Sequence, residues 1–379
     1  MALMAYAKNA VQNAGTVRDA ARAGNLGVLG SLAGPALRGF VLQMGRRGAR
    51  TEMPASHAAT FSWQYQQDQP EMAKLYALAK SSQWDAATAL DWSTPVDPYD
   101  PSRELMLDTF LPLREHPAYR SLPPRRQAEQ RQAIASWMLS QFLHGEQGAL
   151  LAACQVTESV VWMDGKLYGS TQVVDEGRHV EVFSRYLQEK LERIWTIDDN
   201  LFVVVDALLR DAAWDLKFLG MQIMIEGLAL GAFGTMRAST QEPLLRELLK
   251  NVITDEARHV HYGVVALREH YANLSEKLRR DREDWAFEMA LLLRNRFLAH
   301  EFYEEFYGHL MSRKAWDAFI LGSEFMRLFR ATMFRRIVPN LKRIGLLSER
   351  IRPHYAALGL LEYEHGKAAP ELSAAELLA

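Results

Sequence analysis

Two stretches of the chain repeat one pattern of chemically active residues, Asp-Glu-x-Arg-His, at residues 175–179 and 255–259. Residues three apart on a helix lie on nearly the same face, so the Glu and the His of each repeat can reach one point in space. A single Glu-x-x-His is weak support for a site, because about one is expected by chance in a chain of this size. Another match does occur, at residues 362–365. The repetition is therefore the informative feature.

A further glutamate precedes each repeat at the same distance. Glu146 lies 30 residues before Glu176, and Glu226 lies 30 residues before Glu256. If each pair sits on two antiparallel helices, four helices carry four carboxylates and two imidazoles to one level of a bundle interior. The predicted metal ligands, which we also expect to be the catalytic centre, are Glu146, Glu176, His179, Glu226, Glu256 and His259.

Helix-breaking residues between the paired glutamates support this geometry. Two residues of an antiparallel helix pair lie at the same height when they are equidistant from the turn between the helices. The midpoint of the second pair is residue 241, which lies inside the Ser-Thr-Gln-Glu-Pro stretch 239–243. The midpoint of the first pair is residue 161, about one helical turn before the expected break at Asp164-Gly165.

The type of metal follows from the predicted donor atoms. Glutamate is rarely buried without a partner, yet Glu226 stands in the apolar run 221–230. Two divalent cations would offset that cost; the alternatives are a neutral Glu226 or a pair with a buried arginine. Four carboxylates and two imidazoles form a hard site, unlike the thiolate-rich sites of structural zinc. We therefore expect two iron ions, with manganese as the alternative at one or both positions.

The remaining charged residues of the repeats are candidates for support of the ligands. Metal-bound imidazoles usually donate their second N–H to a carboxylate. We expect Asp175 and Asp255 each to orient the histidine of the opposite repeat, with Arg178 and Arg258 balancing the two aspartates. The alternative is that these four residues form ordinary surface ion pairs.

The elements that must position these residues are helices. From about residue 127 to 347 the apolar residues recur three and four apart, and strand patterns are absent. The predicted helices span 127–162, 168–195, 199–237, 243–273, 282–311 and 314–346. The predicted division of the chain is an N-terminal arm over 1–100, partly helical with a loosely ordered start, a helical di-metal domain over 101–347 and a C-terminal tail over 348–379.

Composition and charge limit the partners and the cellular location that we expect. The net charge of −2 gives no bulk reason to expect nucleic acid as a partner. The only cysteine, Cys154, cannot form an internal disulfide, which favours a reducing cytoplasmic location. We find no signal peptide and no run of 18 apolar residues. The apolar stretch 25–45 could be an amphipathic arm that touches a membrane surface; the alternative is an arm packed on its own domain.

With these motifs, segments 146–186 and 219–267 resemble the catalytic subunits of bacterial multicomponent monooxygenases, the soluble methane, toluene and phenol hydroxylases. They resemble more distantly the small subunit of class I ribonucleotide reductase. The resemblance implies an all-α, ferritin-like four-helix bundle with additional C-terminal helices. The chain departs from both families: Phe183 stands where the reductase subunit has a radical-bearing tyrosine, and Leu230 stands where the hydroxylases have a threonine.

The resemblance also implies a function, namely O2 activation by two iron ions. The expected enzyme is a di-iron oxygenase, a monooxygenase or N-oxygenase type of oxidoreductase that acts on an apolar or aromatic small molecule. His179 and His259 would be terminal ligands, as would Glu146 and Glu226, and Glu176 and Glu256 would bridge the metals. The residues expected to line an apolar pocket, or else simply to fill the core, are Leu150, Ala153, Phe183, Leu230 and Phe233.

We also expect an electron donor and a second subunit as partners, and two other functions remain as alternatives to an oxygenase. One cysteine cannot hold an iron–sulfur cluster, and no flavin or nicotinamide fingerprint is present, so an external reductase or ferredoxin is the expected electron donor. A homodimer is also expected from the resemblance. The alternatives to an oxygenase are an R2-like ligand-binding or self-oxidising di-metal protein, and a radical-generating subunit of another enzyme.

Overall fold

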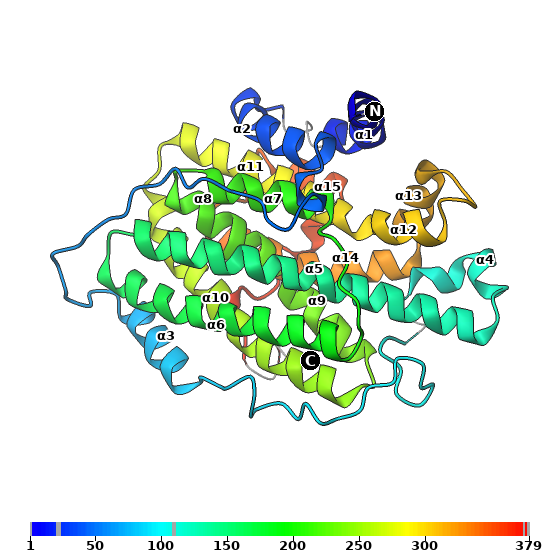
Figure 1. Cartoon of the computed structure of the whole chain (residues 1–379). Coiled ribbons are helices and arrows are strands. Elements are labelled where there is room, and N and C mark those ends of the chain that lie inside the picture. The colour runs from blue at the N-terminus through cyan, green and yellow to red at the C-terminus, as the bar shows by residue number, and fades with distance from the viewer. Residues whose placement is uncertain (1, 20–23, 108–110, 374–375, 377–379) are drawn as a thin grey trace.

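Four long helices form the centre of the computed structural model, which describes residues 2–19, 24–107, 111–373 and 376. They are α5 (Pro124–Ser159), α6 (Met163–Glu189), α9 (Glu226–Ser239) and α10 (Pro243–Ala272). Figure 1 shows α5 and α6 side by side, with α9 and α10 beside them. The described residues contain no strand. The predicted all-α bundle with additional C-terminal helices is confirmed.

The turns of the two helix pairs lie at the midpoints of the paired glutamates. The first turn covers residues 160–162, and the second covers 240–242. The expected break at Asp164-Gly165 was therefore wrong by about one turn, because both residues lie inside α6. Asp164 instead accepts a hydrogen bond from the backbone N–H of Gln69 at 3.0 Å, just before α3 (Pro70–Ser81).

Three predicted helices are broken in the structure. The span 199–237 divides into α7 (Asp199–Arg210) and a second helix that begins with α8 (Trp214–Phe218), because Asp211 accepts from the backbone of Ala213 and closes a turn. The span 282–311 ends at Ala299, whose φ of 48° is left-handed and stops the helix. The span 314–346 breaks at Ser323, whose side chain caps the next helix.

A π-helical segment, η5 (Leu219–Ile225), continues α8 directly into α9. Segments of this type carry one extra residue per turn and often occur at functional sites. Here the segment ends immediately before Glu226, the first residue of α9. The continuous stretch Trp214–Ser239 is apolar enough to cross a membrane by length and composition, but 94% of its apolar 18-residue window is buried in the protein. It is a core helix that carries one charged residue to the centre of the bundle.

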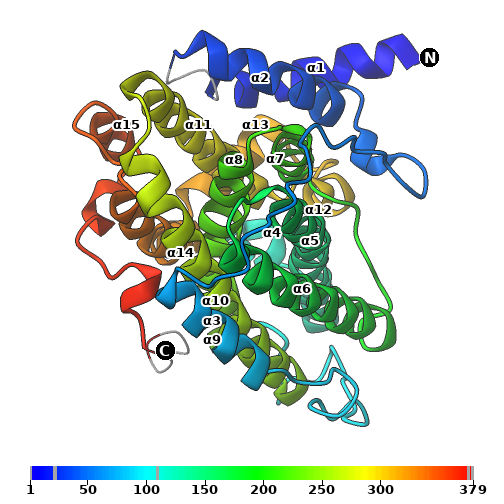
Figure 2. The same ribbon diagram turned by 90° about the vertical axis from the view of Figure 1, so that its left-hand side faces the viewer.

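The other elements cover this bundle (Figures 1 and 2). The N-terminal helices α1 and α2 lie together at one end of the molecule, next to α7 and α11. The C-terminal helix α14 packs against α9. The remaining α-helices are α1 (Ala2–Asp19), α2 (Leu26–Ala36), α4 (Pro117–Arg120), α11 (Glu276–Asn295), α12 (His300–Phe306), α13 (Arg313–Gly322), α14 (Glu324–Arg343) and α15 (Arg352–Ala357). The other π and 3-10 turns are η1 (Leu37–Val41), η2 (Met44–Arg46), η4 (Pro112–Glu115), η6 (Arg296–Leu298), η7 (Leu361–Tyr363) and η8 (Ala369–Glu371).

Candidate metal centre

The six predicted ligands lie together in the middle of the bundle, and each is at most 5% exposed. They form two groups in which the ligand atoms all lie within 4.8 Å of one another. The first group consists of Glu146, Glu176, His179 and Glu256. The second group consists of Glu176, Glu226, Glu256 and His259. The groups share Glu176 and Glu256, which is the arrangement that two bridging carboxylates require.

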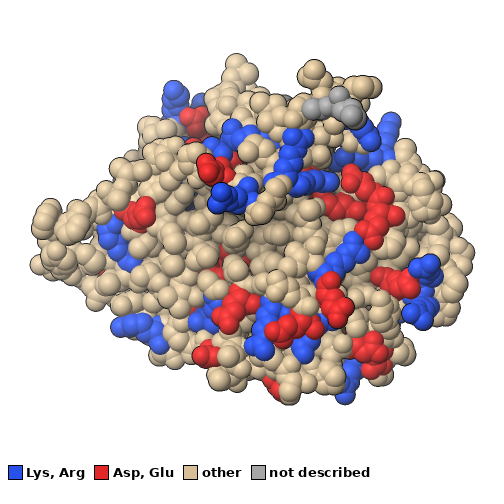
Figure 3. Space-filling model, viewed as in Figure 1, with Lys and Arg blue, Asp and Glu red and all other residues tan. Residues whose placement is uncertain are grey.

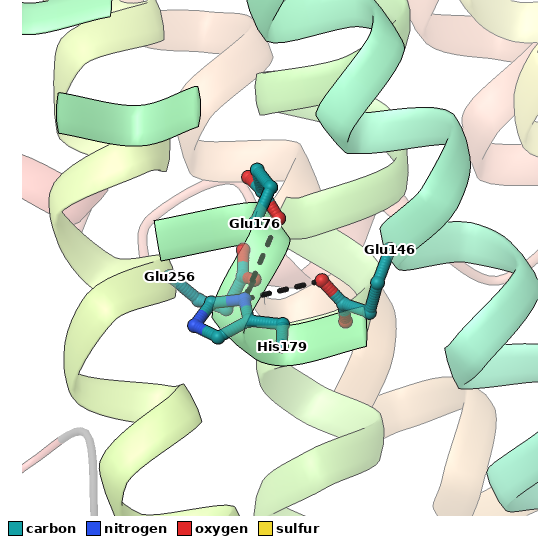
Figure 4. Close-up of side chains that lie close together, drawn as sticks. All are labelled: Glu146, Glu176, His179 and Glu256. Carbon is teal, nitrogen blue, oxygen red and sulfur yellow. Dashed lines mark hydrogen bonds and ion pairs between the residues drawn. The ribbon is translucent and has the colours of Figure 1, made fainter. Parts of the chain in front are cut away.

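His179 faces three carboxylates of the first group (Figure 4). Its Nδ1 lies 3.2 Å from Glu146 Oε2, 3.4 Å from Glu176 Oε2 and 3.1 Å from Glu256 Oε1. These atoms come from α5, α6 and α10, so the first group ties three helices together.

His259 occupies the equivalent place in the second group. Its Nδ1 lies 3.1 Å from Glu176 Oε1 and 3.5 Å from Glu256 Oε2. Glu226 completes this group from α9. The two imidazole rings are 5.9 Å apart between centroids. The near-symmetry of the groups follows from the sequence repeat, since each helix pair supplies one Glu and one Glu-x-x-His.

Each imidazole is held from behind by the aspartate of the other repeat. His179 Nε2 lies 3.2 Å from Asp255 Oδ2, and His259 Nε2 lies 3.2 Å from Asp175 Oδ2. With the proton on Nε2 donated to the aspartate, the lone pair of Nδ1 points at the carboxylates. This is the orientation that metal-binding histidines need.

Two buried arginines join the aspartates into one network. Arg178 contacts Asp175 and donates to Asp255 at 3.0 Å, while Arg258 contacts Asp255 and donates to Asp175 at 3.2 Å. All four residues are at most 7% exposed. The alternative of ordinary surface ion pairs was therefore wrong. The crossed contacts also lock α6 to α10 behind the ligands.

Two contacts to this network come from residues just after α3, in a stretch without regular structure. Trp84 donates its indole N–H to Asp255 at 2.8 Å, and Gln83 donates to Asp175 at 2.9 Å. Gln83 also accepts a hydrogen bond from Arg178 at 2.8 Å. Neither residue carries a signal in the sequence, because Gln83 lies 92 residues before Asp175 and Trp84 lies 171 residues before Asp255.

A buried glutamine pair orients the carboxylates from the other side. Gln172, one turn before Glu176, donates to Glu176 Oε1 at 3.1 Å and to Glu226 Oε1 at 2.9 Å. Gln222, in the π-helical segment, donates to Gln172 at 3.2 Å. An amide that bonds two ligands from different helices fixes their separation. The position of Gln172 at helical spacing from Glu176 was the available signal in the sequence.

Burial and mutual charge perturb the ionisation of the ligands in the absence of a cation. Burial, followed by repulsion from Glu256, raises the pKa of both Glu146 and Glu226 well above the usual value. Burial alone would lower the pKa of His179, but hydrogen bonds with Asp255 and the facing glutamates outweigh it and raise that pKa. Without a cation, protonation of some ligands lowers the electrostatic cost of holding several buried carboxylates close together.

The donor set fits two divalent cations. Several ligand atoms are buried and make no hydrogen bond: Glu176 Oε2, Glu226 Oε2, both oxygens of Glu256 and His259 Nδ1. Buried polar atoms without a partner are rare, and each needs an explanation such as a bound ion. Hard carboxylate and imidazole donors at this number suit iron or manganese.

A small cavity adjoins the cluster. It has a volume of about 10 Å³, and its walls include Glu146, Glu226, Phe142, Phe233 and Arg296. Of the five predicted pocket residues, only Phe233 lines it. Phe183 stacks on Phe233 at 5.7 Å, whereas Leu150 and Ala153 are not among the walls of the cavity.

Leu230 faces a different space. It lines an outer groove of about 540 Å³ between α9 and α14, together with Phe325, Phe329 and Arg336. The two predicted pocket residues of α9 therefore border different spaces: Phe233 lines the cavity at the ligands, and Leu230, on a neighbouring face of the same helix, lines the outer groove.

No protein-family model and no curated protein matches the chain. The solved structures that match include three mutants of R2-like ligand-binding oxidases with a reconstituted Mn/Fe cofactor. They are 18%, 18% and 17% identical in sequence, with TM-scores of 0.45, 0.48 and 0.44. Each match covers 74% of this chain and 94% or 95% of the solved chain.

Proposed function

We propose that the protein is a di-metal oxidoreductase that activates O2. The observation that carries this proposal is the pair of buried ligand groups that share Glu176 and Glu256. A bundle core that needed only stability would not collect four carboxylates, because each is costly to bury without compensation. Two adjacent metal positions with oxygen-rich ligands are suited to redox reactions of O2.

The chain has distinct tasks at this centre. Redox-active iron or manganese would supply the electrons for reduction of O2 and the coordination positions where it binds. The carboxylates of Glu176 and Glu256 would hold the two ions at a fixed separation. Asp175 and Asp255 hold the imidazoles in the ligand orientation, and the surrounding helices exclude water from the centre.

The finer assignment has two forms. The first is a monooxygenase or N-oxygenase of an apolar or aromatic small molecule, supplied with electrons by a separate reductase or ferredoxin. The second is an R2-like ligand-binding or self-oxidising protein without repeated substrate turnover. The cavity at the centre favours self-oxidation over turnover of an organic substrate, because about 10 Å³ holds roughly one water molecule and no organic molecule.

Metal stoichiometry tests the proposal itself. The purified protein, stripped of metal and loaded without oxygen with Fe²⁺ or with Mn²⁺ and Fe²⁺, should bind two ions per chain. Glu226→Ala should lose the ion of the second group and keep a folded helical spectrum. A wild-type protein that binds one ion or none, as measured by elemental analysis after gel filtration, contradicts the proposal.

Oxygen consumption separates the two forms. A self-oxidising protein should consume about one O2 per di-metal centre and then stop, and its own mass should change. An oxygenase should continue to consume O2 when a reductant and an apolar or aromatic compound are added, while the protein mass stays constant. An oxygen electrode together with intact-protein mass spectrometry makes both measurements on one sample.

A further inference from the structure

The first helix of the chain turns its polar side chains towards the protein. Asn9 and Asn13 are buried, and both donate from Nδ2 to backbone carbonyls of the segment that follows α2: Asn9 to Val41 and Asn13 to Phe40, each at 3.1 Å. Arg313 of α13 donates to Asn13 at 3.1 Å. Hydrogen bonds rather than apolar contacts therefore attach the inner face of α1 to the domain.

The outer face of α1 is apolar. Leu3, Met4 and Val11 are 83%, 79% and 77% exposed, and Val17 is half exposed. Three alanines at positions 7, 10 and 14 fill the spaces between them at helical spacing. This arrangement is the reverse of a surface helix in a soluble protein, which buries its apolar face and exposes its polar face.

The second helix extends this apolar surface. Leu26 is 84% exposed and Leu37 is half exposed. They are eleven residues apart, about three helical turns, so they lie on one side of α2 and its π-helical continuation η1. Within the stretch Leu26–Arg46, an 18-residue window has a mean hydropathy of 1.2, yet only 28% of that window is buried.

Positive charge accompanies this surface. The first 50 residues contain seven Lys or Arg and one Asp, a net charge of +6, whereas the whole chain carries −2. Basic and acidic side chains are intermingled on the face of the molecule in Figure 3. Arg38 forms an ion pair with Asp206 and Arg46 forms one with Asp199. These two pairs hold the segment after α2 against α7. Lys8, Arg18 and Arg50 are exposed and form no ion pair with any residue that the structure describes.

We propose that α1 and α2 form an anchor that lies on an anionic lipid bilayer, with Leu3, Met4, Val11 and Leu26 in the acyl boundary. Apolar side chains on one face with free Lys and Arg beside them are what such a surface binds. A second copy of the chain fits this face less well. A twofold contact places the same patch on both sides, so it would bring two positive arms together.

Sedimentation with vesicles tests the anchor directly. The full chain, with any tag at the C-terminus, should sediment with vesicles of equal phosphatidylcholine and phosphatidylglycerol, and much less with phosphatidylcholine alone. The double variant Leu3→Glu/Val11→Glu should bind these vesicles with a partition coefficient more than about tenfold lower, because two apolar side chains that would transfer from water into the bilayer are replaced by charged ones. The matched control Leu310→Glu/Leu328→Glu changes two exposed leucines elsewhere and should bind as the wild type does.

Three results would overturn the anchor. One is a wild-type protein that stays in the supernatant with anionic vesicles. Another is equal loss of binding in the control double variant. The third is a lipid-independent dimer, measured by analytical ultracentrifugation, that the Leu3→Glu/Val11→Glu variant dissociates, since a second copy would then cover the face. Two bound metal ions in each variant show that the fold is intact, so failure of the anchor leaves the proposed function untouched.

Discussion

The chemistry of the centre depends on residues that hold the ligands as much as on the ligands. Each histidine has two ring nitrogens, and the aspartate of the opposite repeat decides which of them faces the carboxylates. Because the two Asp–His contacts cross between α6 and α10, the repeat in the sequence becomes a reciprocal brace in space. The aspartates remain anionic, since hydrogen bonding with His179 and the charge of Arg258 outweigh burial and lower the pKa of Asp255.

This brace predicts the effect of Asp255→Asn. The neutral amide holds the Nε2 proton of His179 more weakly and leaves Arg178 and Arg258 with less opposing charge. We expect metal affinity to fall by about 10- to 100-fold, with a folded protein. Titration with Mn²⁺ followed by EPR of the free ion measures the affinity. The control is Glu247→Gln, an exposed position of α10; an Asp255→Asn protein as tight as that control would contradict the role.

Metal binding should also release protons. Burial and repulsion raise the pKa values of Glu146 and Glu226, and facing carboxylates raise that of His179, so we expect the metal-free centre to hold protons that a bound cation displaces. Cations compete with those protons, so affinity should fall as the pH is lowered from 7.5 to 6. Calorimetry of Mn²⁺ binding in two buffers with different ionisation enthalpies gives the number released. A buffer-independent enthalpy would show that the metal-free ligands are already deprotonated.

At the scale of elements, symmetry in the sequence proved more reliable than local breaking residues. The turns lie at residues 160–162 and 240–242, as the spacing of the paired glutamates required. Asp164-Gly165 looked like a turn, but both residues lie in the first turn of α6, which begins at Met163. There Asp164 accepts a hydrogen bond from the backbone N–H of Gln69. A side chain that caps a distant element cannot be distinguished from a local turn residue by composition.

Other features could not be predicted because they depend on tertiary contacts. Trp84 and Gln83 reach the centre from an irregular stretch, where no periodicity indicates a direction. Arg296 is only 3% exposed and lines the cavity from the short 3-10 turn η6, where no long helical period indicates its direction. Ligands on long helices follow a period, whereas residues supplied by loops follow the packing of the complete chain.

The contact between α9 and α14 gives a test of packing close to the centre. A Cβ atom on Gly231 would lie 2.9 Å from Met333 Cα and from the backbone oxygen of Thr332, and backbone cannot move aside easily. Gly231→Ala should therefore lower the free energy of unfolding by about 1–3 kcal/mol. Gly234→Ala is the matched control, because its Cβ meets nothing within 4 Å in the same helix. It should be neutral or stabilising by about 0.5–1 kcal/mol. Urea denaturation compares them, and equal effects would contradict the close crossing.

For the whole molecule, the centre is a source of instability that bound metal removes. Four carboxylates converge in a core that otherwise consists of apolar side chains. Folding brings these charges out of water, and the network of Asp175, Asp255 and the two arginines lies outside the ligand cluster and cannot neutralise it. The stability of the protein should therefore depend on metal more strongly than its extensive apolar core would suggest.

Glu226→Gln tests this dependence, because the change keeps the shape of the side chain and removes its charge. The pKa of Glu226 is raised on folding, so its contribution to stability is present at low pH and is lost as the pH rises through the raised value. Without metal, the variant should therefore be more stable than the wild type by about 1–3 kcal/mol at pH 7.5, with a smaller difference at pH 5.

With Mn²⁺ at 100 times its dissociation constant, each occupied position adds about 2.7 kcal/mol to the stability of the wild type, and the variant should lose one of the two increments. Thermal and urea unfolding with and without Mn²⁺ measure these differences, with Glu181→Gln on the exposed face of α6 as the control. If Glu226→Gln were less stable than the wild type without metal and gained as much from Mn²⁺, Glu226 would be a structural residue and not a ligand.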